Sequence, residues 1–183
     1  METKQTAAAS TTAVGTVVML SGPVGAGKTT VAKELISLWA GPLSYIEGDT
    51  FWSFIAKSKS SDLRENFRII MRAMTAAALP FARSGYDVLL DFSIPPEFLK
   101  TAGVILKEVA LDYVVLKPSQ AICETRAAGR KEGAIDDYGP YRDFYAMFVC
   151  AERHVIQDDE ADARAVARRI QDGLRAGVFR VGA

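Results

Sequence analysis

The chain has 183 residues and a formal charge of zero at pH 7, because 22 basic side chains balance 22 acidic ones. Duplex-binding modules and peripheral membrane proteins usually carry a basic excess, since Lys and Arg supply their affinity for phosphate. We therefore expect neither nucleic acid nor a membrane as a partner. The length suits one domain, and the 49% hydrophobic content indicates a globular core rather than a disordered chain.

Cysteine and histidine are scarce. Cys123 and Cys150 are too few for a disulfide framework and lack metal-ligand spacing, which favours a cytoplasmic location. His154 is the only histidine, so a His-rich zinc site is excluded. The apolar stretches are shorter than the ~20 residues that span a bilayer, and the first residues do not resemble a signal peptide. The size alone leaves both a monomer and a homodimer open.

Apolar periodicity predicts an alternation of strands and helices after a tail of small residues. The tail, residues 1–15, is expected to be disordered, and residues 16–183 are expected to form one domain. Strands are expected at residues 16–21, 43–47, 86–92, 112–116 and 154–156. Helices are expected at residues 28–39, 62–83, 95–109, 120–128, 141–151 and 159–175. This alternation predicts a three-layer α/β fold with a doubly wound, mainly parallel sheet of five strands.

The segment GPVGAGKT, between the first strand and the first helix, matches the phosphate-loop pattern G-x-x-x-x-G-K-[ST]. Its glycines let successive backbone N–H groups point at phosphate oxygens, where a helix N-terminus adds positive charge. Lys28 can reach the distal phosphates, and the Thr29 hydroxyl can ligate Mg²⁺. ATP and Mg²⁺ are therefore the expected cofactors, against the alternative of a fortuitous glycine-rich turn. The residues expected to bind the nucleotide here are Gly22, Pro23, Val24, Gly25, Ala26, Gly27, Lys28, Thr29 and Thr30.

Two carboxylates follow strands that should end beside this loop. Asp91 ends an apolar strand, which is the arrangement of a carboxylate that holds Mg²⁺; capping of the next turn is the alternative. Asp49 lies just past the second strand, at the edge where doubly wound sheets bind ligands. There it can orient a substrate hydroxyl and accept its proton, or it can simply cap a helix.

With these residues the sequence resembles the small P-loop kinases, a group that includes nucleoside monophosphate kinases, shikimate and gluconate kinases, and chloramphenicol phosphotransferase. The resemblance covers about residues 16–175. Arg126 and Arg130, four residues apart, resemble the lid arginines of this group, which implies a lid at about residues 129–141 that closes over the nucleotide. The resemblance thus implies catalytic roles for both arginines and nucleotide contact for Arg126. Alternatively, both are solvated partners of acids such as Glu124.

The acceptor region departs from the named members of the group. The second strand lacks the Asp-x-Asp of shikimate kinases, and their glycine cluster after the third strand is replaced by FSIPP, residues 92–96. Trp52 is a candidate for the acceptor pocket, although core packing explains it equally. Arg64 and Arg68 recur on one helix face that would suit an anionic acceptor, and a solvated stripe is as good an explanation.

These residues together predict an ATP- and Mg²⁺-dependent phosphotransferase that moves the γ-phosphate of ATP to a hydroxyl of a small molecule. The acceptor itself cannot be named from the sequence. Two alternatives stay open: a nucleoside monophosphate kinase, and a nucleotide-binding regulatory ATPase without phosphotransfer. A guanine-specific Asn-Lys-x-Asp motif is absent from the sequence.

Overall fold

The apolar run that follows Thr16 forms the central strand of the sheet in the computed structural model, which describes residues 13–59, 62–131 and 133–182. All strand pairs are parallel, and the order is β2-β3-β1-β4-β5. The strands are β1 (Val17–Ser21), β2 (Leu43–Glu47), β3 (Asp87–Asp91), β4 (Leu111–Leu116) and β5 (Val155–Ile156). The α/β class and the five-stranded parallel sheet are therefore confirmed.

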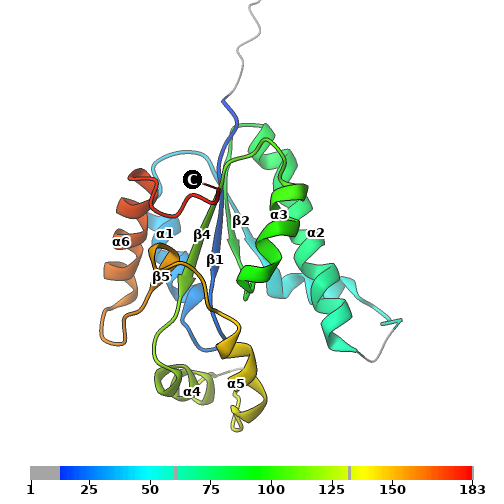
Figure 1. Ribbon diagram of the computed structural model, residues 1–183, viewed down its shortest axis with the longest axis vertical. Coiled ribbons are helices and arrows are strands. Elements are labelled where there is room, and N and C mark those ends of the chain that lie inside the picture. Colours follow the sequence, from blue (N-terminus) through cyan, green and yellow to red (C-terminus); the bar gives the residue numbers. More distant parts are fainter. Residues whose placement is uncertain (1–12, 60–61, 132, 183) are drawn as a thin grey trace, which may run out of the picture.

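Helices cover both faces of the sheet (Figure 1). They are α1 (Lys28–Leu38), α2 (Leu63–Arg83), α3 (Leu99–Ile105), α4 (Gln120–Ala128), α5 (Gly139–Ala146) and α6 (Ala163–Arg175), with short 3-10 turns η1 (Gly48–Phe54), η2 (Pro96–Phe98) and η3 (Glu152–His154). Val17 and Met19 of β1 pack into the core under α2 and α3. Val18 and Leu20 point the other way, into the core under α1 and α6. Because both faces are buried, β1 reads as a continuous apolar run rather than an alternating one.

The element boundaries differ from the predicted ones where local geometry intervenes. The predicted helix at 95–109 divides into η2 and α3, and Glu108 then adopts a left-handed conformation with φ of 71° in the turn to β4. The helix predicted from 159 begins at Ala163, because the Asp162 side chain caps it by accepting from the backbone N–H of Ala165. The helix predicted from 141 begins earlier, at Gly139, inside the predicted lid.

The predicted tail only partly overlaps the described residues. Residues 1–12 lie outside them. The Gly15 N–H donates to the carbonyl of Ala82 at 2.9 Å, so the chain is already attached to the end of α2 before β1 begins. Within the described ranges, none of the helices combines the length and apolar composition needed to cross a membrane.

Two helices, α4 and α5, lie beyond the carboxyl ends of the strands rather than on a face of the sheet (Figure 1). The loop between β1 and α1 is at the same edge, as are the ends of β2 and β3. Ligands of doubly wound sheets bind at this edge. The fold therefore gathers the predicted site residues of four separate segments at one end of the molecule.

Candidate active site

The loop from Gly22 to Thr29 needs its glycines for conformation and for space. Gly22, Gly25 and Gly27 have φ values of 142°, 82° and 89°, which side chains rarely adopt. A Cβ on Gly22 would lie 2.1 Å from the carbonyl oxygen of Leu116, and one on Gly25 would lie 2.1 Å from that of Cys123. The loop is thus pressed against the end of β4 and against α4.

Lys28 folds back over this loop. Its ammonium donates to the carbonyls of Gly22 at 3.2 Å and Pro23 at 3.0 Å. A lysine ammonium has three N–H donors, so one remains for a phosphate oxygen. Burial lowers the pKa of Lys28 to about 8, although the negative charges of Asp91 and Asp49 oppose this shift. Lys28 is therefore still mostly charged at pH 7, but it loses its proton at a lower pH than a free lysine side chain does.

Asp91 lies in direct contact with the loop, as its place at the end of β3 predicted. The Thr29 hydroxyl donates to Oδ2 of Asp91 at 2.8 Å, and the Tyr45 hydroxyl donates to the same oxygen at 3.0 Å. Burial raises the pKa of Asp91, whereas these two hydrogen bonds and the charge of Lys28 lower it.

The hydroxyl oxygen of Thr29 and the carboxylate of Asp91 have the chemistry of magnesium ligands. Mg²⁺ usually keeps several waters and binds through one or two carboxylates together with substrate phosphates. Thr29 and Asp91 are the residues that could hold it. Among the described residues, no cluster of three or more His, Cys, Asp and Glu side chains forms a metal site of its own.

Asp49 is exposed at the end of β2, as the second residue of η1. Its charge raises the pKa values of both Lys28 and Asp91, which places the three groups within electrostatic reach of one another. The buried Gly48 makes this turn possible, because a Cβ there would lie 2.4 Å from Cγ of Phe92. The chain therefore turns over Phe92 just past the end of β3, and Asp49 follows two residues after Glu47, which the strand register pairs with Asp91.

Of the two arginines predicted for the lid, Arg126 lies beside the loop. The Nη1 atom of Arg126 lies 3.6 Å from where a Cβ of Gly27 would be. The positive charge of Arg130 contributes to the lowered pKa of Lys28. Arg126 and Thr30 line a cavity of about 270 Å³, with the apolar side chains of Ile156 and Val166 opposite. A nucleotide base and ribose could occupy such a cavity beside the phosphate loop.

Another cavity, of about 290 Å³, lies at the opposite end of the sheet, where Trp39, Asp112 and Arg180 are among its lining residues. It contains none of the predicted site residues. Both Asp112 oxygens already accept from the Arg180 guanidinium, at 3.0 and 3.2 Å.

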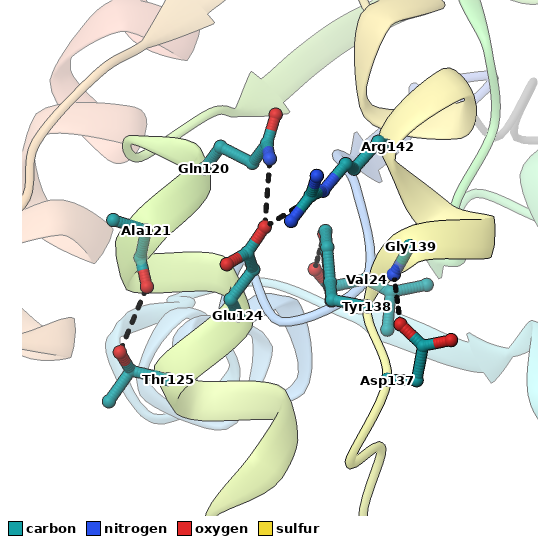
Figure 2. Close-up of polar contacts among 9 residues, drawn as sticks. All are labelled: Val24, Gln120, Ala121, Glu124, Thr125, Asp137, Tyr138, Gly139 and Arg142. Carbon is teal, nitrogen blue, oxygen red and sulfur yellow. Dashed lines mark hydrogen bonds and ion pairs between the residues drawn. The ribbon is translucent and has the colours of Figure 1, made fainter.

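A polar network joins α4, α5 and the phosphate loop (Figure 2). The Tyr138 hydroxyl donates to the carbonyl of Val24 at 2.7 Å. Glu124 of α4 accepts from Gln120 at 2.8 Å and pairs with Arg142 of α5 at 3.5 Å. The predicted lid segment is therefore anchored to α4 and to the loop at its C-terminal end.

The predicted acceptor residues are less closely gathered. Trp52 is half-buried and stacks on Phe67 of α2, with ring centroids 6.5 Å apart, as part of the apolar core. Arg64 and Arg68 are exposed on α2. The groups that shift the pKa of Lys28 through their charge are Asp91, Asp49, Arg130 and Cys123, none of which belongs to α2. Binding of an acceptor by these three residues remains a prediction.

Tyr45 and Tyr138 were missed by the sequence reasoning, although both touch the phosphate-binding machinery. The sequence holds only part of a signal for Tyr45. Strand alternation puts Tyr45 on the same face as Glu47. The register that aligns Glu47 with Asp91 is visible only in the structure. For Tyr138 we find no sequence signal, since its contact with Val24 joins residues 114 positions apart.

The sheet order and the loop define the class as a P-loop NTPase fold of the kinase-like group. A family model described as "AAA domain" matches residues 17–139, and the chain belongs to that family. No curated protein matches the sequence.

Several solved structures share the fold. An APS kinase of Mycobacterium tuberculosis, in complex with AMPPNP and APS, is 17% identical, with a TM-score of 0.65 over 88% of this chain and 98% of that one. A sugar kinase from Janibacter sp. is 18% identical, with a TM-score of 0.66 over 88% and 95%. A gluconokinase from Sinorhizobium meliloti is 17% identical, with a TM-score of 0.61 over 90% and 93%. These neighbours confirm the expected resemblance to small-molecule kinases at the level of the fold.

Proposed function

We propose that this protein is an ATP- and Mg²⁺-dependent phosphotransferase that moves the γ-phosphate of ATP to a hydroxyl of a small molecule. One observation carries the proposal: Asp49 is an exposed carboxylate two residues past Glu47, which pairs in register with Asp91, so it lies at the same edge of the sheet as the phosphate loop and Thr29. A site for nucleotide binding alone would need the loop, Thr29 and Asp91. An additional exposed carboxylate at this edge suits an acceptor hydroxyl.

Each group then has a distinct task. The loop amides, Lys28 and the lid arginines Arg126 and Arg130 offset negative charge on the transferring phosphoryl group. Thr29 and Asp91 would hold Mg²⁺, which when bound neutralises charge on the phosphate oxygens. Asp49 aligns the acceptor hydroxyl and takes its proton. Catalysis by such a site is mostly positioning and charge neutralisation.

The acceptor can be found by measuring ADP release from Mg·ATP in the presence of hydroxylated metabolites, antibiotics and nucleotides. A true acceptor should stimulate ADP release and itself gain labelled phosphate. ADP release that no compound stimulates would favour the regulatory ATPase instead.

The role of Asp49 is tested by Asp49→Asn once an acceptor is known. General base catalysis contributes typically about 10²- to 10⁴-fold, so acceptor phosphorylation should fall by that factor while ATP binding persists. Lys28→Ala should instead weaken nucleotide binding itself. Glu97→Gln, at the exposed position of η2, is a matched control that should change neither. Transfer at the wild-type rate by Asp49→Asn would show that Asp49 is not the base.

The nucleoside monophosphate kinase alternative depends on Arg64 and Arg68, which could hold an acceptor phosphate. Both guanidinium groups are exposed on the part of α2 that follows η1. The same screen tests it, because each nucleoside monophosphate can be supplied with labelled ATP. If a monophosphate is the acceptor, Arg64→Ala and Arg68→Ala should raise its KM and leave the KM of ATP unchanged.

A further inference from the structure

We infer that Tyr138 is a positioning residue that holds the phosphate loop in its binding conformation, an inference that rests on the proposed function of this site. Tyr138 is 5% exposed, and its ring packs in the core beneath α1 and α6. Its hydroxyl donates to the Val24 carbonyl at 2.7 Å (Figure 2). The donor stands 114 positions away from the acceptor in the sequence, outside the loop pattern.

Peptide geometry turns this contact into a constraint on the loop. The described residues contain no cis peptide bonds, so the unit joining Val24 to Gly25 is planar and trans. The N–H of Gly25 therefore points opposite to the Val24 carbonyl. Fixing that carbonyl toward Tyr138 fixes the N–H on the other side of the loop, where an anion would bind.

The neighbouring peptides are held by other groups. Lys28 accounts for the carbonyls of Gly22 and Pro23, and the Cys123 carbonyl backs Gly25. Tyr138 thus completes a set of restraints on consecutive loop peptides. Unlike Lys28, it carries no charge near neutral pH, because burial raises the pKa of its hydroxyl further. It can therefore orient the loop without taking part in charge neutralisation.

The constraint should matter most for the distal phosphates. The base cavity is lined by Gly27 and Thr30, so the phosphate chain would run from there toward Lys28 and Asp91. Gly25 precedes these residues in the loop, away from the start of α1. Its N–H therefore suits the β- or γ-phosphate, whereas the α-phosphate lies near the N-terminus of α1.

Tyr138 is itself held by the docking of α5. Its ring contacts Tyr141 with centroids 5.7 Å apart, and Arg142 ties α5 to Glu124 on α4. The loop is therefore in contact with α4 directly, at Cys123, and is linked to the start of α5 through the buried Tyr138 hydroxyl.

The test compares ADP with AMP, by calorimetry with Mg²⁺, on wild type, Tyr138→Phe and Tyr86→Phe. Loss of one hydrogen bond to a carbonyl should weaken ADP binding about five- to tenfold in Tyr138→Phe. AMP, which lacks the β-phosphate, should bind within about twofold of wild type. Tyr86→Phe removes an exposed hydroxyl just before β3, at the opposite end of the sheet, and should leave both ligands unaffected.

Three results would overturn the inference. Equal losses for ADP and AMP would mean that Tyr138 only shapes the fold, and unchanged ADP binding would mean that the contact contributes nothing to the loop. Faster hydrogen exchange of the Gly25 amide in Tyr138→Phe is also expected, and an unchanged exchange rate would contradict the inference even if the variant is destabilised. Failure of the wild type to bind Mg·ADP would instead refute the proposed function.

Discussion

Affinity for nucleotide should fall as the pH rises above 8, because Lys28 loses its charge there. Burial lowers the pKa of Lys28 to about 8, against 10.5 for the free side chain. About nine-tenths of the side chains would be protonated at pH 7 and about one-tenth at pH 9. If only the ammonium form binds the phosphates, the apparent affinity for ADP should fall about tenfold between these values, or about 1.4 kcal/mol.

The Cys123 thiol and the hydroxyls of Tyr45 and Tyr138 titrate above this window. Burial raises the pKa of Cys123 to about 11 and raises the pKa values of Tyr45 and Tyr138 above their ordinary range. The second pKa of a phosphate monoester is about 6, so the ligand is already mostly charged at pH 7 and loses no charge as the pH rises further. A slope between pH 7 and 9 would therefore report Lys28.

Calorimetry of ADP binding without Mg²⁺, in buffers of different ionisation enthalpy, measures both the affinity and the number of protons taken up on binding. Binding should take up about half a proton at pH 8 and nearly one at pH 9. Lys28→Arg is the matched control, since a guanidinium stays charged throughout this range. Its affinity should be lower than that of wild type but independent of pH. A flat wild-type profile, or an equal slope in Lys28→Arg, would refute the lowered pKa.

The unliganded protein should show the opposite dependence. Between pH 8 and 10.5 the unfolded chain retains the Lys28 proton that the folded chain has lost. Because the unfolded state then binds more protons, the contribution of Lys28 to stability increases with pH across this window. Urea denaturation of wild type and Lys28→Met at pH 7 and 9.5 would separate this contribution from those of other groups.

Two further substitutions test the structure around the site and away from it. Tyr45→Phe removes a hydrogen bond to Asp91. The factor by which Mg²⁺ increases the affinity for ADP should therefore decrease about three- to tenfold, whereas Tyr86→Phe, the control, should not change it. An unchanged factor in Tyr45→Phe would mean that Tyr45 does not position the carboxylate. Glu108→Gly relieves a left-handed backbone and should stabilise the protein by about 1 kcal/mol, or about 2–4 °C in Tm by calorimetry, whereas Lys107→Gly should not stabilise it.

The fold was predictable because its signals are local. The apolar run of β1, the glycines after it and the amphipathic spacing of α2 each indicate their element without knowledge of the rest of the chain. The alternation of strands and helices then predicts a parallel sheet. The order of the strands was not predictable, since β1 separates β3 from β4 through pairings that no local pattern specifies.

The grouping of the phosphate loop with the two carboxylates, which is the ATP half of the proposed site, was predictable for a similar reason. Gly22 to Thr29 form a contiguous motif, and Asp91 and Asp49 follow strands whose carboxyl ends must share one edge. The acceptor half was not. Whether Trp52 faces a pocket or the core depends on Phe67, fifteen positions later and on another element, and the structure stacks the two rings.

The distinction between local and long-range contacts also limits what a phosphate-loop motif alone can predict. Within the loop, Lys28 holds its own neighbours, but the outer restraints come from the second half of the chain: the Leu116 carbonyl against Gly22, the Cys123 carbonyl against Gly25, and the Tyr138 hydroxyl on Val24. None of these contacts exists until β4 has paired with β1 and α4 and α5 have docked at the carboxyl edge. If Tyr138 positions the loop as inferred, the glycines permit the loop conformation and the segment from Leu116 to Tyr138 holds it. Mutations in that segment should therefore alter nucleotide affinity even where they leave every residue of the motif unchanged.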